Sequence, residues 1–186
     1  MSMRNLGLVV LGLLLGGCAT SGGTTTTSGG AREVPALGQP ATAAQIAGWD
    51  ISIAPDGAGL PPGRGTSAQG APVYEQKCQA CHGARGAGQP NDRLVGGQGT
   101  LAGPAPVRTI GSYWPYATTL FDYVRRSMPY TQSQSLTSDE VYALCAYLLH
   151  LNGIIGEQDE MNAQTLPKVH MPNRDSFILV YPPRGR

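Results

Sequence analysis

The sequence is poor in charged residues and has almost no net charge. Asp, Glu, Lys and Arg make up 13% of its 186 residues, and the formal net charge is +1. A nucleic-acid-binding protein would carry a strongly basic patch, so we expect no partner of that class. Phe and Trp occur only twice each, whereas Gly (26) and Pro (15) are plentiful. This balance indicates long irregular segments around a modest core.

The sequence also lacks an apolar run of the roughly 20 residues that a transmembrane helix needs. The run at residues 6–15 is only ten residues long, and it follows Arg4 and precedes Gly-Gly-Cys. A positive start and a short apolar stretch are typical of an export signal. The end of this run resembles a bacterial lipobox, which implies a signal peptide at residues 1–17 and acylation of Cys18. An ordinary signal peptide with a chance cysteine at the cleavage site is the alternative.

The lipobox resemblance implies a lipid anchor on the periplasmic side of a bacterial membrane. Ala19 rather than aspartate follows the cysteine, which by the same resemblance favours the outer membrane. Residues 21–30 read SGGTTTTSGG, a composition typical of a flexible tether. We therefore interpret residues 18–66 as a linker and an irregular arm, with a possible short helix at residues 41–47.

Three helical patterns indicate an all-α fold. They cover about residues 68–79, residues 116–127 and a segment that starts after Thr137. Thr137 and Glu140 have the spacing of a capping box, and Gly153 stands where a C-terminal capping glycine belongs. These patterns predict one domain at residues 67–155.

The remaining segments show weaker patterns. A glycine-rich loop occupies residues 83–111, and residues 156–186 form a C-terminal tail. No strand pair with hairpin chemistry is predicted before the tail. Residues 177–181 (FILVY) have the composition of a short strand.

The motif that carries the chemistry is Cys78-Gln79-Ala80-Cys81-His82, the C-x-x-C-H signature of covalent haem attachment. Two thiols three residues apart lie on one helical turn and can add to the two vinyl groups of one porphyrin. The adjoining His82 is then placed as an axial ligand of the iron. The motif occurs once, which predicts one haem c. A zinc site built from Cys78, Cys81, Cys145 and His150 is the alternative, although it would leave His82 without a role.

The sixth iron ligand decides what such a haem can do. The candidates by residue type are Met128, Met161, Met171, His150 and His170. Met128 is favoured because it follows the second helix within a Met-Pro pair, and Met171-Pro172 in the tail is the next choice. A thioether ligand saturates the iron and raises its potential, which suits electron transfer.

These features together resemble class I cytochromes c over about residues 67–155. The resemblance implies that a loop carbonyl, with Pro90 as the best match, orients His82, and that Leu94 packs on the porphyrin. It also implies contact between the first and last helices, which maps to Gly70 and Tyr74 against Leu144 and Tyr147. Trp114 and Tyr113 are the candidates to donate a hydrogen bond to a haem propionate. Arg93 and Arg108 are the candidates to form an ion pair with one.

A narrower resemblance covers nearly the whole mature chain. Strings such as RLVGGQGTL, GSYWPYATTLFDYVRRSMPY and LPKVHMPNRDSF resemble the cytochrome subunits of Sox-type sulfane dehydrogenase and of sulfite dehydrogenases. That subunit of the sulfane dehydrogenase carries two haems, whereas one attachment motif occurs here. The resemblance implies a molybdenum-containing sulfite- or sulfane-oxidising subunit as the partner and a downstream cytochrome or oxidase as the acceptor.

The sequence shows no paired carboxylates and no nucleophile with a base beside the haem motif, so it predicts an electron carrier rather than an enzyme. Two other functions stay open. One is a haem enzyme, either a peroxidase or a thiosulfate-converting cytochrome. The other is a module that mainly anchors a partner enzyme to the membrane.

Overall fold

The computed structural model describes residues 37–178 and residue 180. The predicted signal peptide, Cys18 and the tether lie outside the described residues. The chain divides into a unit at Met1–Pro40 and a unit at Ala41–Arg186, and the helices and strands given below belong to the second. None of the helices among the described residues combines the length and the apolar character needed to cross a membrane.

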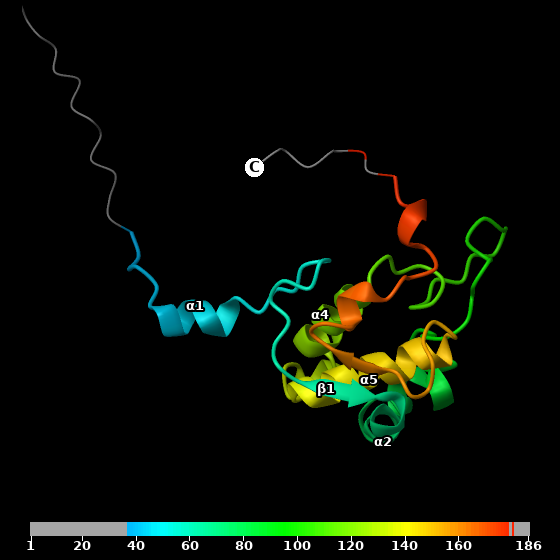
Figure 1. Ribbon diagram of the computed structural model, residues 1–186, viewed down its shortest axis with the longest axis horizontal. Helices are drawn as coiled ribbons and strands as arrows, with labels where there is room; N and C mark the ends of the chain where they lie inside the picture. Colours follow the sequence, from blue (N-terminus) through cyan, green and yellow to red (C-terminus); the bar gives the residue numbers. More distant parts are fainter. Residues whose placement is uncertain (1–36, 179, 181–186) are drawn as a thin grey trace, which may run out of the picture. The chain divides into compact units, whose positions relative to one another are not determined.

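Helices form most of the regular secondary structure in the described part of the chain, in line with the all-α prediction (Figure 1). Its α-helices are α1 (Ala43–Trp49), α2 (Ser67–Lys77), α3 (Gln79–His82), α4 (Ala117–Ser127) and α5 (Ser138–Leu151). Short 3-10 helices lie between and after them, at Ala84–Gly86, Tyr130–Gln132, Leu166–Lys168 and Arg174–Ser176. The described sheet consists of two strands, β1 (Arg64–Thr66) and β2 (Glu160–Asn162).

Helices α1, α2 and α5 each begin with a capping box, in which a threonine side chain and the Glu or Gln three residues later satisfy each other's backbone N–H groups. The pairs are Thr42 with Gln45, Thr66 with Gln69 and Thr137 with Glu140. The third pair confirms the sequence prediction. The other two have the same T-x-x-Q spacing and mark the starts of α1 and α2 just as clearly.

Helix α5 is the centre of the core, and α2 and α4 both pack against it (Figure 1). Helix α2 crosses α5 at Gly70, where a Cβ atom would overlap the backbone carbonyl of Ala143 and crowd the Tyr147 side chain. One turn later the rings of Tyr74 and Tyr147 meet with centroids 5.4 Å apart. The predicted contact between the first and last helices of the domain is therefore present, and it depends on the absence of a side chain at Gly70.

The C-terminal tail is part of this core. Strand β2 pairs antiparallel with β1, with Met161 opposite Gly65. The tail side chains of Met161, Leu166, Val169 and Met171 are all buried in the main hydrophobic cluster. The prediction of a strand at residues 177–181 is wrong where the structure describes this segment. Residues 177, 178 and 180 are exposed and do not form a strand. The tail wraps the domain at least as far as Met171.

Part of the arm is also tied to the helices. The backbone N–H of Ile53 donates to the Asp122 carboxylate on α4 at 3.0 Å, and the Thr118 hydroxyl donates to the carbonyl of Pro55 at 3.2 Å. The Tyr142 hydroxyl of α5 donates to the carbonyl of Pro61 at 2.9 Å. The arm therefore becomes part of the folded domain from about Ile53 onward.

Candidate haem site

The C-x-x-C-H motif forms a single helical turn at the end of α2. Cys78 ends α2, and its carbonyl accepts hydrogen bonds from the backbone N–H groups of Cys81 at 3.1 Å and His82 at 2.9 Å. Positions i, i+3 and i+4 lie on the same face of a helix. Local helix geometry alone therefore places the two thiols and the imidazole side by side.

These three residues line a cleft of about 710 Å³ between the helices and the glycine-rich loop. Buried apolar side chains of α4, α5 and the loop form much of its wall, namely Ile110, Leu120, Val124, Leu144 and Leu148. A largely apolar cavity of this size with a few convergent polar groups is typical of a cofactor site.

The second ring nitrogen of His82 has a backbone partner. Its Nδ1 atom lies 2.9 Å from the carbonyl oxygen of Asp92. The resemblance to class I cytochromes c had assigned this carbonyl to Pro90, and that prediction is wrong by two residues. Pro90 still lines the cleft. The loop turns back over the motif, because the N–H groups of Gly88 and Asn91 donate to the carbonyls of His82 and Cys81. That turn brings the Asp92 carbonyl over the imidazole.

Of the candidate sixth ligands, Met128 is the one that lines the cleft. It caps the C-terminus of α4, where its backbone N–H donates to the carbonyl of Val124. The other candidates lie away from the cleft lining. Met161 and Met171 are buried in the hydrophobic core, and His170 is exposed beside Asp175. His150 lies in the last turn of α5.

The predicted pocket residues Pro90, Leu94 and Trp114 all line the cleft, together with Arg93 and Arg108. Trp114 packs edge-on against Tyr123, with ring centroids 5.6 Å apart. The Arg108 guanidinium lies over the ring of Tyr113 at 5.6 Å. Arg93 and Arg108 are therefore the candidates to pair with a carboxylate of a bound cofactor. Tyr113, which was also a candidate to contact a haem propionate, does not line the cleft.

Asn152, which the sequence analysis missed, fastens the loop that carries Leu94. Its side-chain oxygen accepts from the N–H of Gly96 at 3.0 Å, and its amide nitrogen donates to the carbonyls of Leu94 and Leu148. Asn152 directly follows α5 as its C-terminal cap. The end of the central helix thereby sets the position of one wall of the cleft. The sequence signal that could have identified this residue is the asparagine just before the final glycine of the string AYLLHLNG.

Burial sets the protonation of the free side chains around the site. It raises the pKa of the Cys78 thiol to about 11, with Lys77 opposing and Cys81 reinforcing the shift. It also raises the pKa of Tyr74 to about 12, and the Tyr74 hydroxyl donates to the carbonyl of Gly83 just after the motif. Both groups are therefore neutral at physiological pH before any cofactor is attached.

The zinc alternative finds no support in the described part of the chain. Cys145 is fully buried in the hydrophobic core, and burial raises the pKa of its thiol strongly. No group of three or more His, Cys, Asp or Glu side chains among the described residues is placed to hold a metal ion. The Cys145 thiol packs as a small apolar side chain.

A helical domain whose C-x-x-C-H turn faces an apolar cleft with a methionine in its wall defines a class of protein, the c-type cytochromes. The cofactor of this class is covalently bound haem c, and the two thiols, the imidazole and the cleft volume fit it. Haem, once bound, supplies one-electron redox chemistry.

Comparison with known proteins agrees. Residues 65–148 match the family of cytochrome c oxidase, cbb3-type, subunit III. A chain in the crystal structure of the sulfane dehydrogenase SoxCD from Paracoccus pantotrophus matches with a TM-score of 0.74 and 40% identity, over 78% of this chain and 72% of that one. A thiosulfate dehydrogenase from Psychrobacter arcticus is 30% identical over 82 residues, which span 44% of this chain and 25% of that protein.

The chain belongs to the Sox-type c-type cytochromes, with the class I, all-α cytochrome c fold that the sequence predicted. Its general function is electron transfer, and it is related to proteins of sulfur oxidation.

Proposed function

We propose that this chain is a periplasmic monohaem cytochrome that accepts single electrons from a molybdenum-containing sulfite- or sulfane-oxidising subunit. It passes them to a downstream cytochrome or oxidase and performs no substrate chemistry of its own. The observation that carries the proposal is the joint placement of Cys78, Cys81, His82 and Met128 on one apolar cleft. In this proposal the two cysteines attach the haem, and His82 and Met128 ligate its iron.

Residues of this chain orient the proposed ligands. The Asp92 carbonyl can only accept a hydrogen bond, so its contact with Nδ1 of His82 requires the proton on that nitrogen. The Nε2 lone pair is then free for iron, and the imidazole ring is held in one orientation. The end of α4 holds Met128 at the cleft. A haem held by His82 and Met128 would supply one-electron transfer rather than chemistry on oxygen or peroxide.

The similarity to the sulfane dehydrogenase SoxCD supports an oxidoreductase partner of the same chemical class. The direct test is to mix the purified haem-loaded protein with such an enzyme from the same organism and its substrate, and to follow haem reduction by rapid-mixing spectroscopy. We expect reduction within the enzyme's turnover time. If no sulfite- or sulfane-oxidising enzyme reduces the protein, the partner assignment fails and a general electron carrier remains.

Attachment of the haem is tested independently of the partner. Cys78→Ala or Cys81→Ala should abolish double thioether attachment, which the pyridine haemochrome spectrum and the mass of the protein report. The domain is small and part of its apolar cleft would lie open, so the haem-free protein should also fold poorly. A cooperative haem-free domain with native helix content would contradict this.

The proposed lipid anchor would hold the protein at the periplasmic face of a bacterial membrane, and the residue after Cys18 favours the outer membrane. Two or more acyl chains on Cys18 would bind stably to a bilayer. Cys18→Ser should prevent lipid modification and impair processing at that site, which mass spectrometry detects, whereas the wild-type protein should be absent from the soluble periplasmic fraction. Recovery of unlipidated wild-type protein in that fraction would rule the anchor out.

A second function, a haem enzyme that converts thiosulfate, is favoured by the similarity to a thiosulfate dehydrogenase. It would require an iron with an open or different sixth position. Identification of the sixth ligand in the ferric protein by its absorption and magnetic circular dichroism spectra separates the two functions, because Met128 ligation favours the electron carrier.

A further inference from the structure

Helix α1 has no covering surface among the described residues. It is seven residues long and begins with a complete capping box, yet none of its residues is buried. Trp49 is 87% exposed and Ile46 is 53% exposed. Isolated helices of this length are marginal in water, and most helices gain their stability by packing an apolar face. Ile46 and Trp49 lie one turn apart on the same face of this helix, so both side chains are available to bind another molecule.

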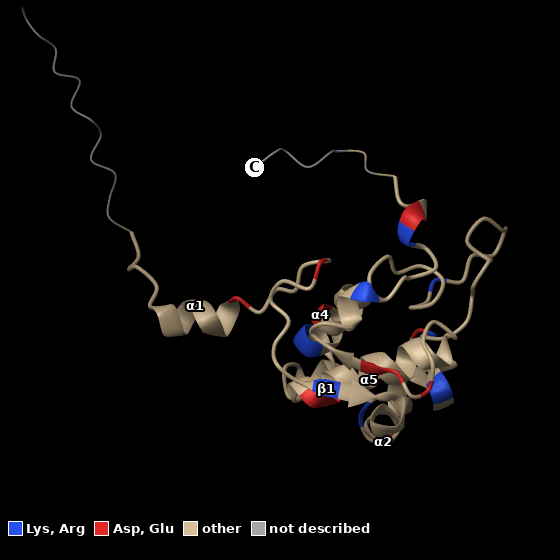
Figure 2. Ribbon diagram, viewed as in Figure 1, with Lys and Arg blue, Asp and Glu red and all other residues tan. Residues whose placement is uncertain are grey.

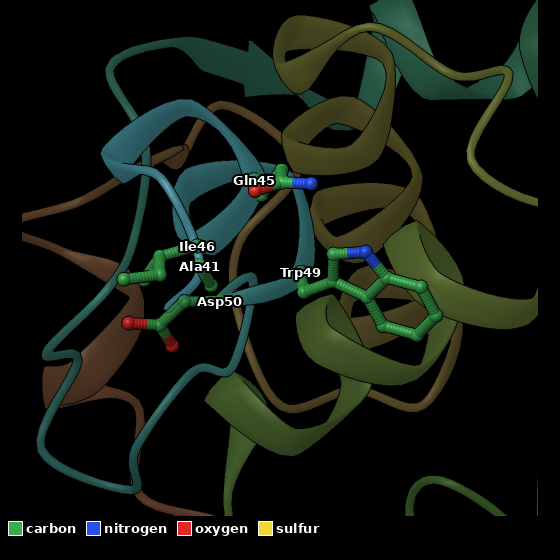
Figure 3. A pocket seen from close by; sticks show the side chains of 5 residues that line it. All are labelled: Ala41, Gln45, Ile46, Trp49 and Asp50. Atoms are coloured by element: carbon green, nitrogen blue, oxygen red, sulfur yellow. The ribbon is translucent and has the colours of Figure 1, made fainter. Parts of the chain in front are cut away.

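The side chains of α1 border a shallow hollow that a partner could fill. Ala41, Gln45, Ile46, Trp49 and Asp50 line it, and Figure 3 shows the Trp49 indole extending away from the helix. The lining is apolar apart from one amide and one carboxylate. Tryptophan is enriched among the few residues that dominate the binding energy of protein interfaces.

Charge favours a protein partner over a lipid surface. The sequence contains no Lys or Arg between Arg32 and Arg64, whereas Glu33, Asp50 and Asp56 are acidic. Figure 2 shows no basic residue on α1, and the residue that caps its C-terminus is Asp50. Helices that lie on anionic bilayers carry Lys and Arg on their polar face. The complementary surface for α1 is an apolar groove bordered by cationic side chains.

The match to the SoxCD structure extends beyond the haem-binding segment. It covers 78% of this chain, whereas the cytochrome family model matches only residues 65–148. The similarity therefore includes much of the chain outside residues 65–148, although α1 buries nothing in this chain's own core. Retention of such segments in a chain of SoxCD favours a role in assembly.

We propose that α1 is the docking element for the oxidising subunit, with Ile46 and Trp49 entering an apolar groove on that subunit. This inference rests on the proposed function and assigns its binding surface to one helix. The tail is the weaker candidate, because its residues up to Met171 are used in the core of this domain.

The test uses the full-length, haem-loaded protein and the molybdenum-containing sulfite- or sulfane-oxidising enzyme from the same organism. Initial rates of haem reduction are measured against cytochrome concentration for wild type, Ile46→Ser, Trp49→Ser and the double variant. We expect KM for the cytochrome to rise about tenfold or more in the double variant, the scale of a lost interface hot spot. The rate at saturating cytochrome, the haem spectrum and the potential should stay unchanged.

Ile178→Ser is the matched control, because Ile178 is an equally apolar side chain that is 89% exposed in the tail. It should leave KM unchanged. If the double variant is reduced with the wild-type KM, the docking inference is wrong while the proposed function stands. If the wild-type protein is not reduced either, both fail.

A membrane role for α1 is tested with vesicles of phosphatidylethanolamine and phosphatidylglycerol and with protein that lacks residues 1–18, which removes both the apolar run at residues 6–15 and the proposed lipid anchor. We expect no binding that depends on Trp49. Vesicle binding that is lost in Trp49→Ser, combined with an unchanged KM, would assign α1 to the membrane instead and overturn the inference.

Discussion

The Nδ1 atom of His82 lies 2.9 Å from the carbonyl oxygen of Asp92. The two residues are ten positions apart, and the loop between them folds back so that the N–H of Asn91 donates to the carbonyl of Cys81 at 2.8 Å. The hydrogen bond orients the imidazole and fixes its tautomer. It makes the loop, rather than the helical turn alone, responsible for how His82 faces the cleft.

If the Asp92 carbonyl orients His82, the Pro90 side chain should matter little to the iron. Pro90→Ala should leave the reduction potential and the spectrum of the axial ligands close to wild type, as measured by redox titration. The matched comparison is His82→Ala, which should abolish the native low-spin spectrum. A large fall in potential in Pro90→Ala would return the orienting role to Pro90.

Met128→Ala should remove the long-wavelength absorption band of the ferric protein that arises from sulfur ligation, and should lower the potential, because a thioether ligand favours ferrous iron. Met171→Ala should keep the band but lose about 2–5 kcal/mol of unfolding free energy, since Met171 is fully buried in the core. Spectroscopy and thermal unfolding of both variants separate ligation from packing. Loss of the band in Met171→Ala would move the ligand to the tail.

Gly70→Ala should destabilise the domain by about 1–3 kcal/mol, because the added methyl group overlaps the carbonyl of Ala143 where α2 crosses α5. Gly48→Ala is the matched control. It is also a helical glycine, but it has open space around its Cβ position, so alanine there should be neutral or slightly favourable to α1. Denaturant unfolding measures both. Equal stability of the two variants would contradict the close crossing.

A variant that ends at Glu157 should lose the native haem environment, because it removes Met161, Leu166, Val169 and Met171 from the core. One that ends at Ser176 should keep the spectrum and potential, although it loses the contact between Phe177 and Tyr113. The pair of truncations is compared by absorption spectrum and thermal unfolding. A stable, native-like protein ending at Glu157 would show that the tail is dispensable.

The ion pair between Lys77 and Glu140 links α2 to the start of α5 at 2.7 Å. The hydrogen bond from Lys77, followed by that from the backbone N–H of Thr137, lowers the pKa of Glu140 below its usual value. The stabilisation is therefore complete above the unfolded-state pKa of about 4.3 and is lost as the pH falls through the lower folded-state value.

Glu140→Gln keeps the capping interaction, as Gln45 and Gln69 do at the other two capping boxes, but removes the charge. It should cost at most about 1 kcal/mol at neutral pH and should flatten the acid side of the stability profile. Urea unfolding between neutral pH and pH 3 measures this. An unchanged acid slope would show that the pair does not contribute.

Residues close together in the sequence were enough to predict the haem-attachment turn and two of the helices. The spacing of Cys78, Cys81 and His82 predicted the haem turn because three residues at i, i+3 and i+4 share a helix face without help from the rest of the chain. The apolar periodicity of α4 and α5 and the Thr137–Glu140 capping box predicted two helices to within a residue or two, since both signals lie within a few turns of helix.

The tertiary structure decided what local patterns cannot show. The pairing of β1 with β2 joins two three-residue segments far apart in sequence, and the core side chains of the tail have no regular spacing that would mark a buried face. The choice of Asp92 over Pro90 depended on the path of a glycine-rich loop, which Asn152 fixes from the end of α5. Such contacts form only when distant segments meet, so their partners are set by packing rather than by neighbouring residues.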